Sequence, residues 1–213
     1  MFIKGMHMRV FDVCFTLYAS NTTFDFITQY HQKAGNKIKF LWCKILLSLP
    51  FKILNKFKLI SLRDNFIYTL KGESKDKLFK FSTIFVDDFL KSKENETTMK
   101  LLLSNQSDSI LISASLDPVI DAIAKKLSVT GYSSKLQYKN GHCTGRLEID
   151  LKGNKHTKII PEELELVVTD NMSDINLIKN SQQSYIVTRK NNNEKWLVLL
   201  SHNNVDLGRI KFL

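Results

Sequence analysis

The order of apolar and amphipathic segments after Asn105 is the feature that most restricts the fold of this chain. The apolar runs "DSILISAS" and "LELVVTD" each lead into an amphipathic segment, "DPVIDAIAKKL" and "MSDINLIKNS" respectively. In the first of these segments we expect Asp117 to be the N-cap and Pro118 to be the first helical residue. Strand–loop–helix units that repeat along a chain predict a parallel α/β sheet.

The other extended segments fit the same sheet. Residues Met8 to Val13 are expected to form a short buried strand, and Asn140-Gly141 predicts the turn of a β-hairpin. We expect a short helix in "KHTKIIPEE". Short strands are expected in "SYIVT" and "KWLVLL", on either side of the polar turn "RKNNNE". The tail "NNVDLGRIKFL" is expected to form a last turn and an edge strand.

The spacing of apolar residues changes to the helical period between Thr22 and about Asn105. Within this region Ser74 is suited to be the N-cap of a helix. The apolar residues that would share one face of that helix are Leu78, Phe81, Phe85 and Phe89.

Together these segments predict one domain with a sizeable insertion, for which 213 residues are sufficient. The fold class is α/β: a Rossmann-like parallel sheet core with helices on both faces. We expect the core to comprise residues 1–20 and 106–213, and the helical insert to comprise residues 21–105.

The cysteine pattern and the N-terminus favour a reducing cytoplasm. Cys14, Cys43 and Cys143 are odd in number and far apart, which matches neither a disulfide framework nor a zinc site. No apolar core of a signal peptide is recognised in "MFIKGMHMRVFDVC", and no window reaches about 18 uninterrupted apolar residues. The formal net charge of +10 indicates either anionic partners or a solvated, lysine-rich surface.

Polar residues at three strand ends are the strongest indication of function. Asp12, Ser113 and Asp170 would meet at one edge of the sheet, and Asp174 follows one helical turn later. Ligands of open parallel sheets bind beyond the carboxyl ends of the strands. A lone aspartate there is commonly a helix cap, but this set suits a phosphate ester. A carboxylate can attack phosphorus, hydroxyls and a lysine can hold phosphoryl oxygens, and further carboxylates can hold Mg²⁺.

Four short motifs in this order resemble the haloacid dehalogenase-like (HAD) hydrolase superfamily, in its phosphoserine-phosphatase-like branch with a helical cap. "DVCFTL" is similar to the first motif, usually written DxDGT, and "VVTDNMSD" to the fourth, usually written GDxxxD. Ser113 in "ILISAS" and Lys155 in "KGNKHTKI" would be the second and third motifs. "YTLKGESKDKLFKF" also looks like the cap segment of that branch.

The resemblance implies a catalytic role for each matching residue. Asp12 would be the nucleophile that forms an aspartyl-phosphate. Thr16 and Ser113 would hydrogen-bond the transferring phosphoryl group, and Lys155 would neutralise it.

The resemblance also implies a Mg²⁺ site. Asp170 would bind the ion beside Asp12, and Asp174 would complete or orient the site. The backbone carbonyl of Cys14 would supply the remaining protein ligand.

Three positions depart from the family pattern. Cys14 replaces the second aspartate, which in the phosphatases protonates the leaving group and activates water. A positioned acid of this kind is typically worth roughly 10²–10⁴-fold in rate, and a thiol substitutes poorly unless its pKa is lowered. Phe15 and Thr169 each replace a glycine. His156, beside Lys155, is either a replacement for the acid or an ordinary surface histidine.

A basic, apolar segment at 32–62 lies within the expected insert. It holds seven lysines, Trp42 and no acidic residue, and Pro50 would divide it into two pieces. Such a segment packs its apolar faces within the cap, lies on an anionic membrane surface, or forms a pocket for an extended phosphorylated substrate. No stacking motif or recognition helix indicates nucleic-acid binding. The pair His142-Cys143 is explained by the turn after Gly141.

The resemblance therefore implies a cytoplasmic, Mg²⁺-dependent phosphatase that hydrolyses a small phosphate monoester. The substrate would be a phosphorylated metabolite or a phospholipid precursor, enclosed by the cap. Two alternatives remain. One is phosphoryl transfer to another acceptor, or another hydrolysis of the HAD type. The other is a catalytically silent protein that binds a phosphorylated ligand or, peripherally, a membrane. The substrate and the oligomeric state are not predicted.

Overall fold

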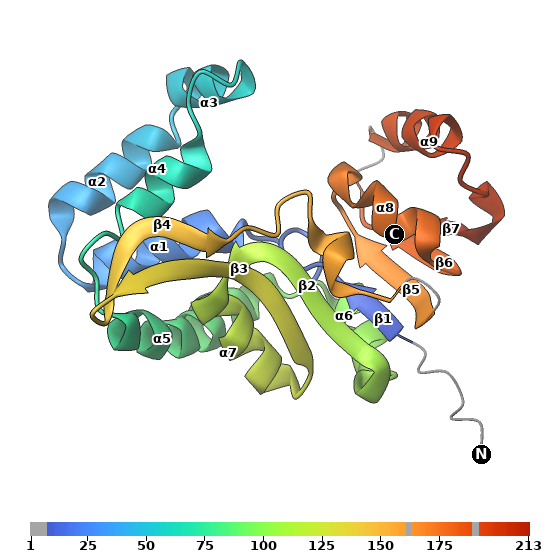
Figure 1. Cartoon of the computed structure of the whole chain (residues 1–213), viewed down its shortest axis with the longest axis horizontal. Coiled ribbons are helices and arrows are strands. Elements are labelled where there is room, and N and C mark those ends of the chain that lie inside the picture. Colours follow the sequence, from blue (N-terminus) through green and yellow to red (C-terminus); the bar gives the residue numbers. More distant parts are fainter. Residues whose placement is uncertain (1–7, 161–162, 189–191) are drawn as a thin grey trace.

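A mostly parallel sheet organises residues 8–160, 163–188 and 192–213, which the computed structural model describes (Figure 1). Its strands are β1 (Met8–Phe11), β2 (Ser109–Leu116), β3 (Thr130–Lys139), β4 (His142–Ile149), β5 (Leu164–Thr169), β6 (Gln183–Ile186) and β7 (Ile210–Phe212). Their order is β4-β3-β2-β1-β5-β6-β7, so β1 lies in the middle, between β2 and β5. Neighbouring strands are parallel except for the antiparallel β3–β4 hairpin, which turns at Asn140-Gly141 as predicted.

Helices occupy most of the remaining described chain. They are α1 (Thr22–Lys33), α2 (Lys37–Leu46), α3 (Leu49–Lys56), α4 (Leu62–Tyr68), α5 (Lys75–Ile84), α6 (Glu96–Leu103), α7 (Asp117–Leu127), α8 (Ile175–Asn180) and α9 (Asn193–His202). A π-helical turn, Phe85–Leu90, continues α5, and a 3₁₀ turn, Lys155–Lys158, lies within the segment where a short helix was predicted. The rest of that segment includes residues 161–162, which lie outside the described residues.

Both faces of the sheet are covered by helices, as the sequence predicted. Successive residues of a strand point to opposite faces. Val10 packs in an apolar cluster with Leu177 of α8 and Trp196 of α9. Phe11 packs in a second cluster that includes Val119 of α7. The central strand is therefore buried on both sides, which is typical of parallel sheets.

The chain between β1 and β2 is mainly helical, and α1 and α5 pack together through aromatic rings. The ring centroid of Phe26 lies 5.6 Å from that of Phe81 and 5.5 Å from that of Phe85. The predicted apolar face of α5 is confirmed, since Leu78 is fully buried along with Phe85. Ser74 is the N-cap of α5, although its side chain makes no capping hydrogen bond.

The prediction of a strand at "KWLVLL" is wrong, because these residues lie in α9. Trp196 and Leu200, one helical turn apart, are the buried residues of this helix. Strands β6 and β7, on either side of it, are parallel, and parallel neighbours need a crossover connection, usually a helix. The predicted polar turn before it includes residues 189–191, which lie outside the described residues.

The predicted N-cap role of Asp117 is also wrong. Leu116 occupies the N-cap position of α7, with Pro118 in the first turn. The carboxylate of Asp117 instead accepts a hydrogen bond of 3.1 Å from the backbone N–H of Leu136 in β3. Asp117 therefore bonds to the backbone of a neighbouring strand instead of capping its own helix.

The basic segment divides into α2 and α3, as predicted, with the break just before Pro50, which lies in the first turn of α3, but its packing was only partly foreseen. Helix α2 buries Cys43 and Leu46, whereas α3 buries no residue at all. Much of the apolar surface of the segment is therefore exposed. None of the described helices combines the length and the apolar character that crossing a bilayer requires.

Candidate active site

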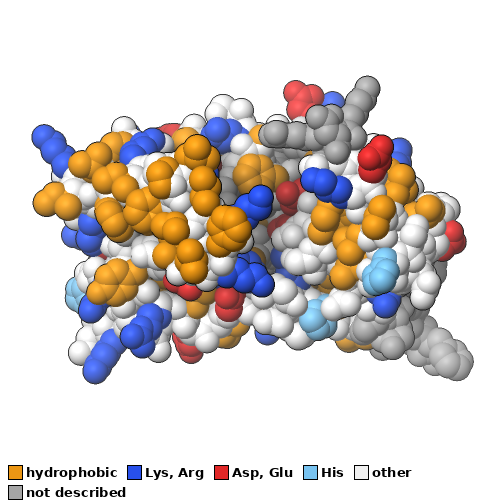
Figure 2. All heavy atoms as spheres, turned by 90° about the horizontal axis from the view of Figure 1, so that it is seen from above, with side chains coloured by type: hydrophobic (Ala, Val, Ile, Leu, Met, Phe, Trp, Pro, Cys, Tyr) orange, Lys and Arg blue, Asp and Glu red, His pale blue; other side chains and the backbone are white. Residues whose placement is uncertain are grey.

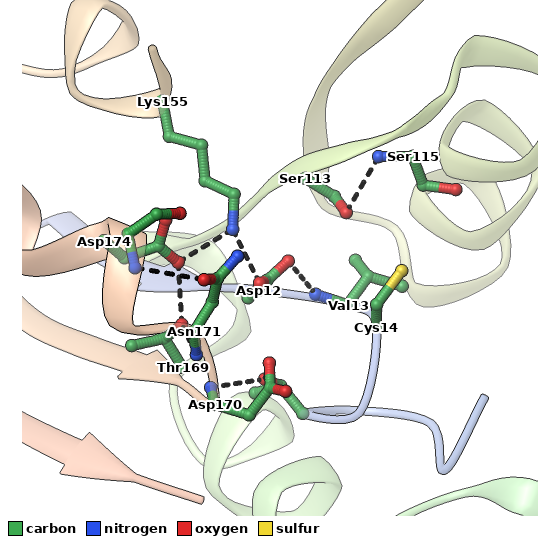
Figure 3. Close-up of polar contacts among 12 residues, drawn as sticks. Asp12, Val13, Cys14, Ser113, Ser115, Lys155, Thr169, Asp170, Asn171 and Asp174 are labelled. Atoms are coloured by element: carbon green, nitrogen blue, oxygen red, sulfur yellow. Dashed lines mark hydrogen bonds and ion pairs between the residues drawn. The ribbon is translucent and has the colours of Figure 1, made fainter. Parts of the chain in front are cut away.

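The predicted strand-end residues converge on one cavity of about 300 Å³. Asp12 follows β1, Ser113 lies in the second half of β2, and Asp170 follows β5. These three strands are neighbours in the sheet, so the parallel register places their carboxyl ends side by side. Lys155, far from all three in sequence, also lines the cavity (Figure 3).

A buried ion-pair network surrounds Lys155. Its ammonium lies 2.6 Å from Oδ2 of Asp12 and 2.8 Å from Oδ2 of Asp174 (Figure 3). The hydroxyl of Thr169 donates a 2.7 Å hydrogen bond to the same oxygen of Asp174. Burial alone would lower the pKa of Lys155, but the charges of Asp12 and Asp174 outweigh it and raise that pKa. Lys155 is therefore a fixed positive charge beside Asp12.

The orientation of Asp12 is fixed from both sides of its carboxylate. Oδ1 accepts a 2.7 Å hydrogen bond from the backbone N–H of Val13, while Oδ2 contacts Lys155. The side chain is buried, and its backbone N–H donates to the carbonyl of Val168 in β5. A carboxylate held in this way keeps one orientation toward the cavity.

Thr16 joins the loop after β1 to the loop after β5. Its hydroxyl donates to Oδ1 of Asp170 at 3.2 Å and accepts from the backbone N–H of Asp170 at 3.0 Å. Thr16 is fully buried and does not line the cavity. The structure thus gives Thr16 a contact with Asp170, whereas the resemblance implied a contact with the phosphoryl group.

Ser113 lies at the cavity wall with its hydroxyl facing the Asp12 side (Figure 3). Oγ accepts a 3.2 Å hydrogen bond from the backbone N–H of Ser115. The Ser115 hydroxyl in turn accepts a 2.8 Å hydrogen bond from Thr22 at the start of α1. Sequence reasoning missed Thr22 and Ser115, because 93 residues separate the two partners.

Cys14 occupies the position where the resemblance places an acid, and its thiol is not activated. Sγ lies 2.9 Å from the hydroxyl of Thr22. Burial, helped by the negative charge of Asp12, raises the pKa of Cys14 to about 11. The thiol therefore remains protonated at neutral pH and cannot serve as a general base there.

The two other residues considered at the sequence level, Phe15 and His156, have clear positions. Phe15 has a φ of 52°, in the left-handed region that favours glycine, and its side chain is half exposed at the cavity. His156 is exposed and does not line the cavity, which favours the interpretation as a surface histidine.

The oxygen atoms around Asp12 suit Mg²⁺ better than a softer metal. Within the described ranges no three His, Cys, Asp or Glu side chains are grouped closely enough to hold a metal ion. Oδ2 of Asp174 contacts both Lys155 and Thr169, and Asp174 does not line the cavity, which fits the orienting role rather than the ligand role. The carboxylates that line the cavity are those of Asp12 and Asp170. Mg²⁺ is typically held by only one or two carboxylates plus waters and substrate oxygens.

The electrostatics of Asp170 support this fit. Burial, and next the negative charge of Asp12, raise the pKa of Asp170 to about 7. Asp12 and Asp170 both line this cavity, and among the contacts of the described residues the ammonium of Lys155 pairs with Asp12 and Asp174 rather than with Asp170. A divalent cation between Asp12 and Asp170 would offset this repulsion.

Arg63 of α4 is a wall residue that sequence reasoning did not find. Its Nη1 contacts both carboxylate oxygens of Asp150 at 2.7 Å. Its Nη2 donates to the carbonyl of Ala114 at 2.7 Å and to the hydroxyl of Ser134 at 2.9 Å. The Arg63 contact lowers the pKa of Asp150 despite the opposing effect of burial. The guanidinium therefore fastens α4 to strands β2 and β3 at the edge of the cavity. No local sequence signal marks it.

Comparisons with known proteins find similarity in structure only. No family model and no curated protein matches the sequence. A protein of unknown function from Bordetella pertussis Tohama I superposes with a TM-score of 0.74 at 13% identity, over 96% of this chain and 97% of that one. A phospho-aspartyl intermediate analogue of phosphoserine phosphatase superposes with a TM-score of 0.55 at 18% identity, over 98% and 94% of the two chains.

A third solved structure, cytosolic 5′-nucleotidase IIIB bound to cytidine, has a TM-score of 0.55 at 12% identity, over 92% of this chain and 79% of that one. At these identities the likeness is one of fold. The chain has the α/β fold of the HAD-like hydrolases, as the motifs predicted.

Proposed function

We propose that this protein is a Mg²⁺-dependent phosphatase of the HAD type, with Asp12 as the nucleophile and a small phosphate monoester as the substrate. The observation that carries the proposal is the buried contact of Lys155 with Asp12 at 2.6 Å and with Asp174 at 2.8 Å, in the wall of a cavity. A carboxylate that is buried, oriented and beside a fixed positive charge suits attack on an anionic ester.

In the first step, a carboxylate oxygen of Asp12 attacks phosphorus. The new O–P bond forms as the bond to the alcohol oxygen breaks, and that oxygen takes a proton from a water molecule to leave as the alcohol. Lys155 would offset the negative charge of the phosphoryl oxygens, and the hydroxyl of Ser113, which also lines the cavity, would hydrogen-bond one of them. Bound Mg²⁺, held by Asp12, Asp170 and the Cys14 carbonyl, would reduce repulsion between carboxylate and ester.

In the second step, water attacks the phosphorus of the aspartyl-phosphate. The Asp12–phosphorus bond breaks, inorganic phosphate leaves and the carboxylate is restored. A general base would accelerate this step, but the Cys14 thiol, with a pKa of about 11, stays protonated. We therefore expect slow turnover, limited by hydrolysis of the phosphorylated enzyme.

The helical segment 21–105 is part of the proposal as a cap. Asn21, Phe24, Asn55 and Arg63 line the cavity together with residues that follow the strands of the sheet. A wall built from both segments would exclude water from the first step. Lys152 adds positive charge to this wall, which suits a substrate that carries negative charge, whereas the charge of Arg63 is paired with Asp150.

The unactivated thiol also favours a second candidate function. Without an acid at position 14, the protein would hold a phosphorylated ligand with little hydrolysis, or pass the phosphoryl group to an acceptor other than water. In both cases the site would still bind the phosphate group, but rapid hydrolysis would be lost.

The test is phosphate release from a broad panel of phosphate esters with Mg²⁺, with the wild type beside Asp12→Asn. Asp88→Asn, at an exposed carboxylate outside the cavity, is the matched control. The proposal expects turnover in the wild type and in Asp88→Asn, and its loss in Asp12→Asn. Turnover that persists in Asp12→Asn contradicts the role of Asp12. Ligand binding without turnover in any sample supports the second candidate.

A further inference from the structure

Helix α2 has two apolar faces, and one of them is open to solvent. Its inner face buries Cys43 and Leu46. The outer face carries a stripe at the spacing i, i+3, i+4 and i+7 whose exposed fractions run from 39% to 83%: Ile38, Leu41, Trp42 and Ile45. A stripe of this kind on a solvated helix is unusual and marks an interaction surface.

Helix α3 and the loop after it extend the same surface. The exposed apolar residues of this part are Leu49, Ile53, Leu54, Phe57 and Leu59. The rings of Trp42 and Phe51 pack edge to face with their centroids 5.9 Å apart, which brings α2 and α3 into contact. Figure 2 shows a broad apolar area on one half of this face of the molecule, with lysines and arginines at its border. We call these residues of α2, α3 and the following loop the α2–α3 surface.

The charged residues of the segment that forms the α2–α3 surface are all basic. Between residues 32 and 62 the sequence holds seven lysines and no acidic residue. Lys39 pairs with Glu73 at 2.7 Å, whereas Lys37, Lys44, Lys52 and Lys56 are exposed. Long lysine side chains can extend their charge to the rim of an apolar area.

We propose that the α2–α3 surface docks onto an anionic lipid bilayer, with its apolar side chains in the interface and its lysines at the lipid head groups. Apolar residues with a lysine border match both layers of such an interface. Two copies of this surface would bring lysines against lysines, which disfavours self-association. Nucleic acid offers no apolar layer for the exposed residues of α2 and α3. This proposal does not depend on the proposed phosphatase activity.

The α2–α3 surface is continuous with the cavity of the candidate site. Asn55 of α3 and Ser61, just before α4, line that cavity together with Arg63. Docking would therefore hold one rim of the cavity near the lipid head groups. The structure thus assigns to one helical segment both the surface and part of the cavity wall.

The first test is co-sedimentation with vesicles of phosphatidylcholine, with and without phosphatidylglycerol, at low and high salt. We expect the wild type to sediment with the anionic vesicles and to be released by salt. Changing Lys37, Lys44, Lys52 and Lys56 to Gln should lower the partition roughly 600-fold, at about a fivefold loss for each of the four lysines. Ile38→Ser with Leu41→Ser and Phe57→Ser should lower it as well. All three positions are exposed, so the fold should be kept, which circular dichroism checks.

The matched controls lie outside the α2–α3 surface. Val198→Ser removes a side chain that is 70% exposed on α9, and Lys125→Gln removes an exposed lysine of α7. Both controls should sediment like the wild type. Equal loss in the controls and in the α2–α3 variants overturns the assignment. Equal binding to neutral vesicles, or no binding at all, overturns the proposal itself.

The two tryptophans allow a second test, which measures how deeply the α2–α3 surface inserts into the bilayer. Trp42 is 42% exposed on the α2–α3 surface, whereas Trp196 is 2% exposed in the core, and the chain has no other tryptophan. Brominated anionic lipids should quench the fluorescence of the wild type but not that of Trp42→Phe, which retains Trp196. Equal quenching in both proteins, or sedimentation without quenching, overturns insertion of the apolar stripe. A concentration-dependent dimer that loses its contact in Leu41→Ser would identify a second copy as the occupant and overturn the proposal.

Discussion

Lys155 contacts Asp12 and Asp174 at once, and its distance to Asp12 is the shorter of the two, 2.6 Å against 2.8 Å. One buried cation thus ties the loop after β1 to the loop after β5. Both carboxylates are buried, so little solvent is available to replace the ammonium. The network is therefore structural as well as catalytic in our proposal.

Lys155→Met should destabilise the fold by about 3–5 kcal/mol, because it leaves two buried carboxylates without a counter-charge. It should also abolish any turnover. The free energy of unfolding, from urea denaturation at neutral pH, measures the first effect. Adding Asp174→Asn to Lys155→Met should recover part of the stability but no activity. If Lys155→Met alone is as stable as the wild type, the ion pairs of Lys155 contribute little to the stability of the fold.

Cys14→Asp should raise phosphate release by roughly 10²–10⁴-fold, because it supplies an acid and base where the thiol is inert. The readout is the rate of phosphate release on the best ester of the panel. Cys14→Ser, which has a similar size and no acid, is the matched control and should not gain activity. If both variants remain at the wild-type rate, the missing acid does not limit turnover.

Phe15→Gly should stabilise the protein by about 1 kcal/mol, because a side chain at positive φ is strained and glycine is not. The φ of Phe15 is 52°, and half of its side chain is already in solvent, so little packing is lost. Phe15→Ala keeps a Cβ in the left-handed region and should show no such gain. Equal urea midpoints for Gly and Ala would argue against strain at this position.

Protonation of His31 should destabilise the fold as the pH falls. Burial chiefly, and the charge of Lys39 to a lesser extent, lower the pKa of His31 from 6.5 to about 4. Between those values the unfolded chain binds more protons, so the free energy of unfolding decreases as the pH falls from 6.5 toward 4. The full effect is about 3 kcal/mol.

The measurement compares urea midpoints at neutral and mildly acidic pH for the wild type and His31→Leu. The variant should lose less stability on acidification. Asp117, whose pKa burial raises to about 6, acts in the opposite direction, so the difference between the two proteins is the quantity to read. His202→Asn, at an exposed position of α9, should behave like the wild type. A variant with the wild-type pH dependence would exclude His31 as the titrating group.

The α/β order, the hairpin and the strand-end position of Asp12 and Asp170 followed from local patterns. The spacing of apolar residues, every second residue in a strand and every three to four in a helix, indicates which face of the element is buried. Residues that directly follow parallel strands lie together at the carboxyl edge of the sheet. The short run "KWLVLL" failed because an apolar run of that length suits either a strand or a helix. Because β6 and β7 are parallel neighbours, the segment that connects them has to cross over the sheet, and this requirement favours a helix for "KWLVLL".

The sequence by itself thus determined the class of fold and which side chains reach one edge of the sheet. Only the tertiary structure decided how those side chains pair. The contact of Arg63 with Asp150 spans 87 residues, and that of Thr16 with Asp170 spans 154. The raised pKa of Cys14 and the open face of α2 are likewise set by what the rest of the chain packs around them. Burial and partner charges are properties of the assembled surroundings, and no local spacing encodes them.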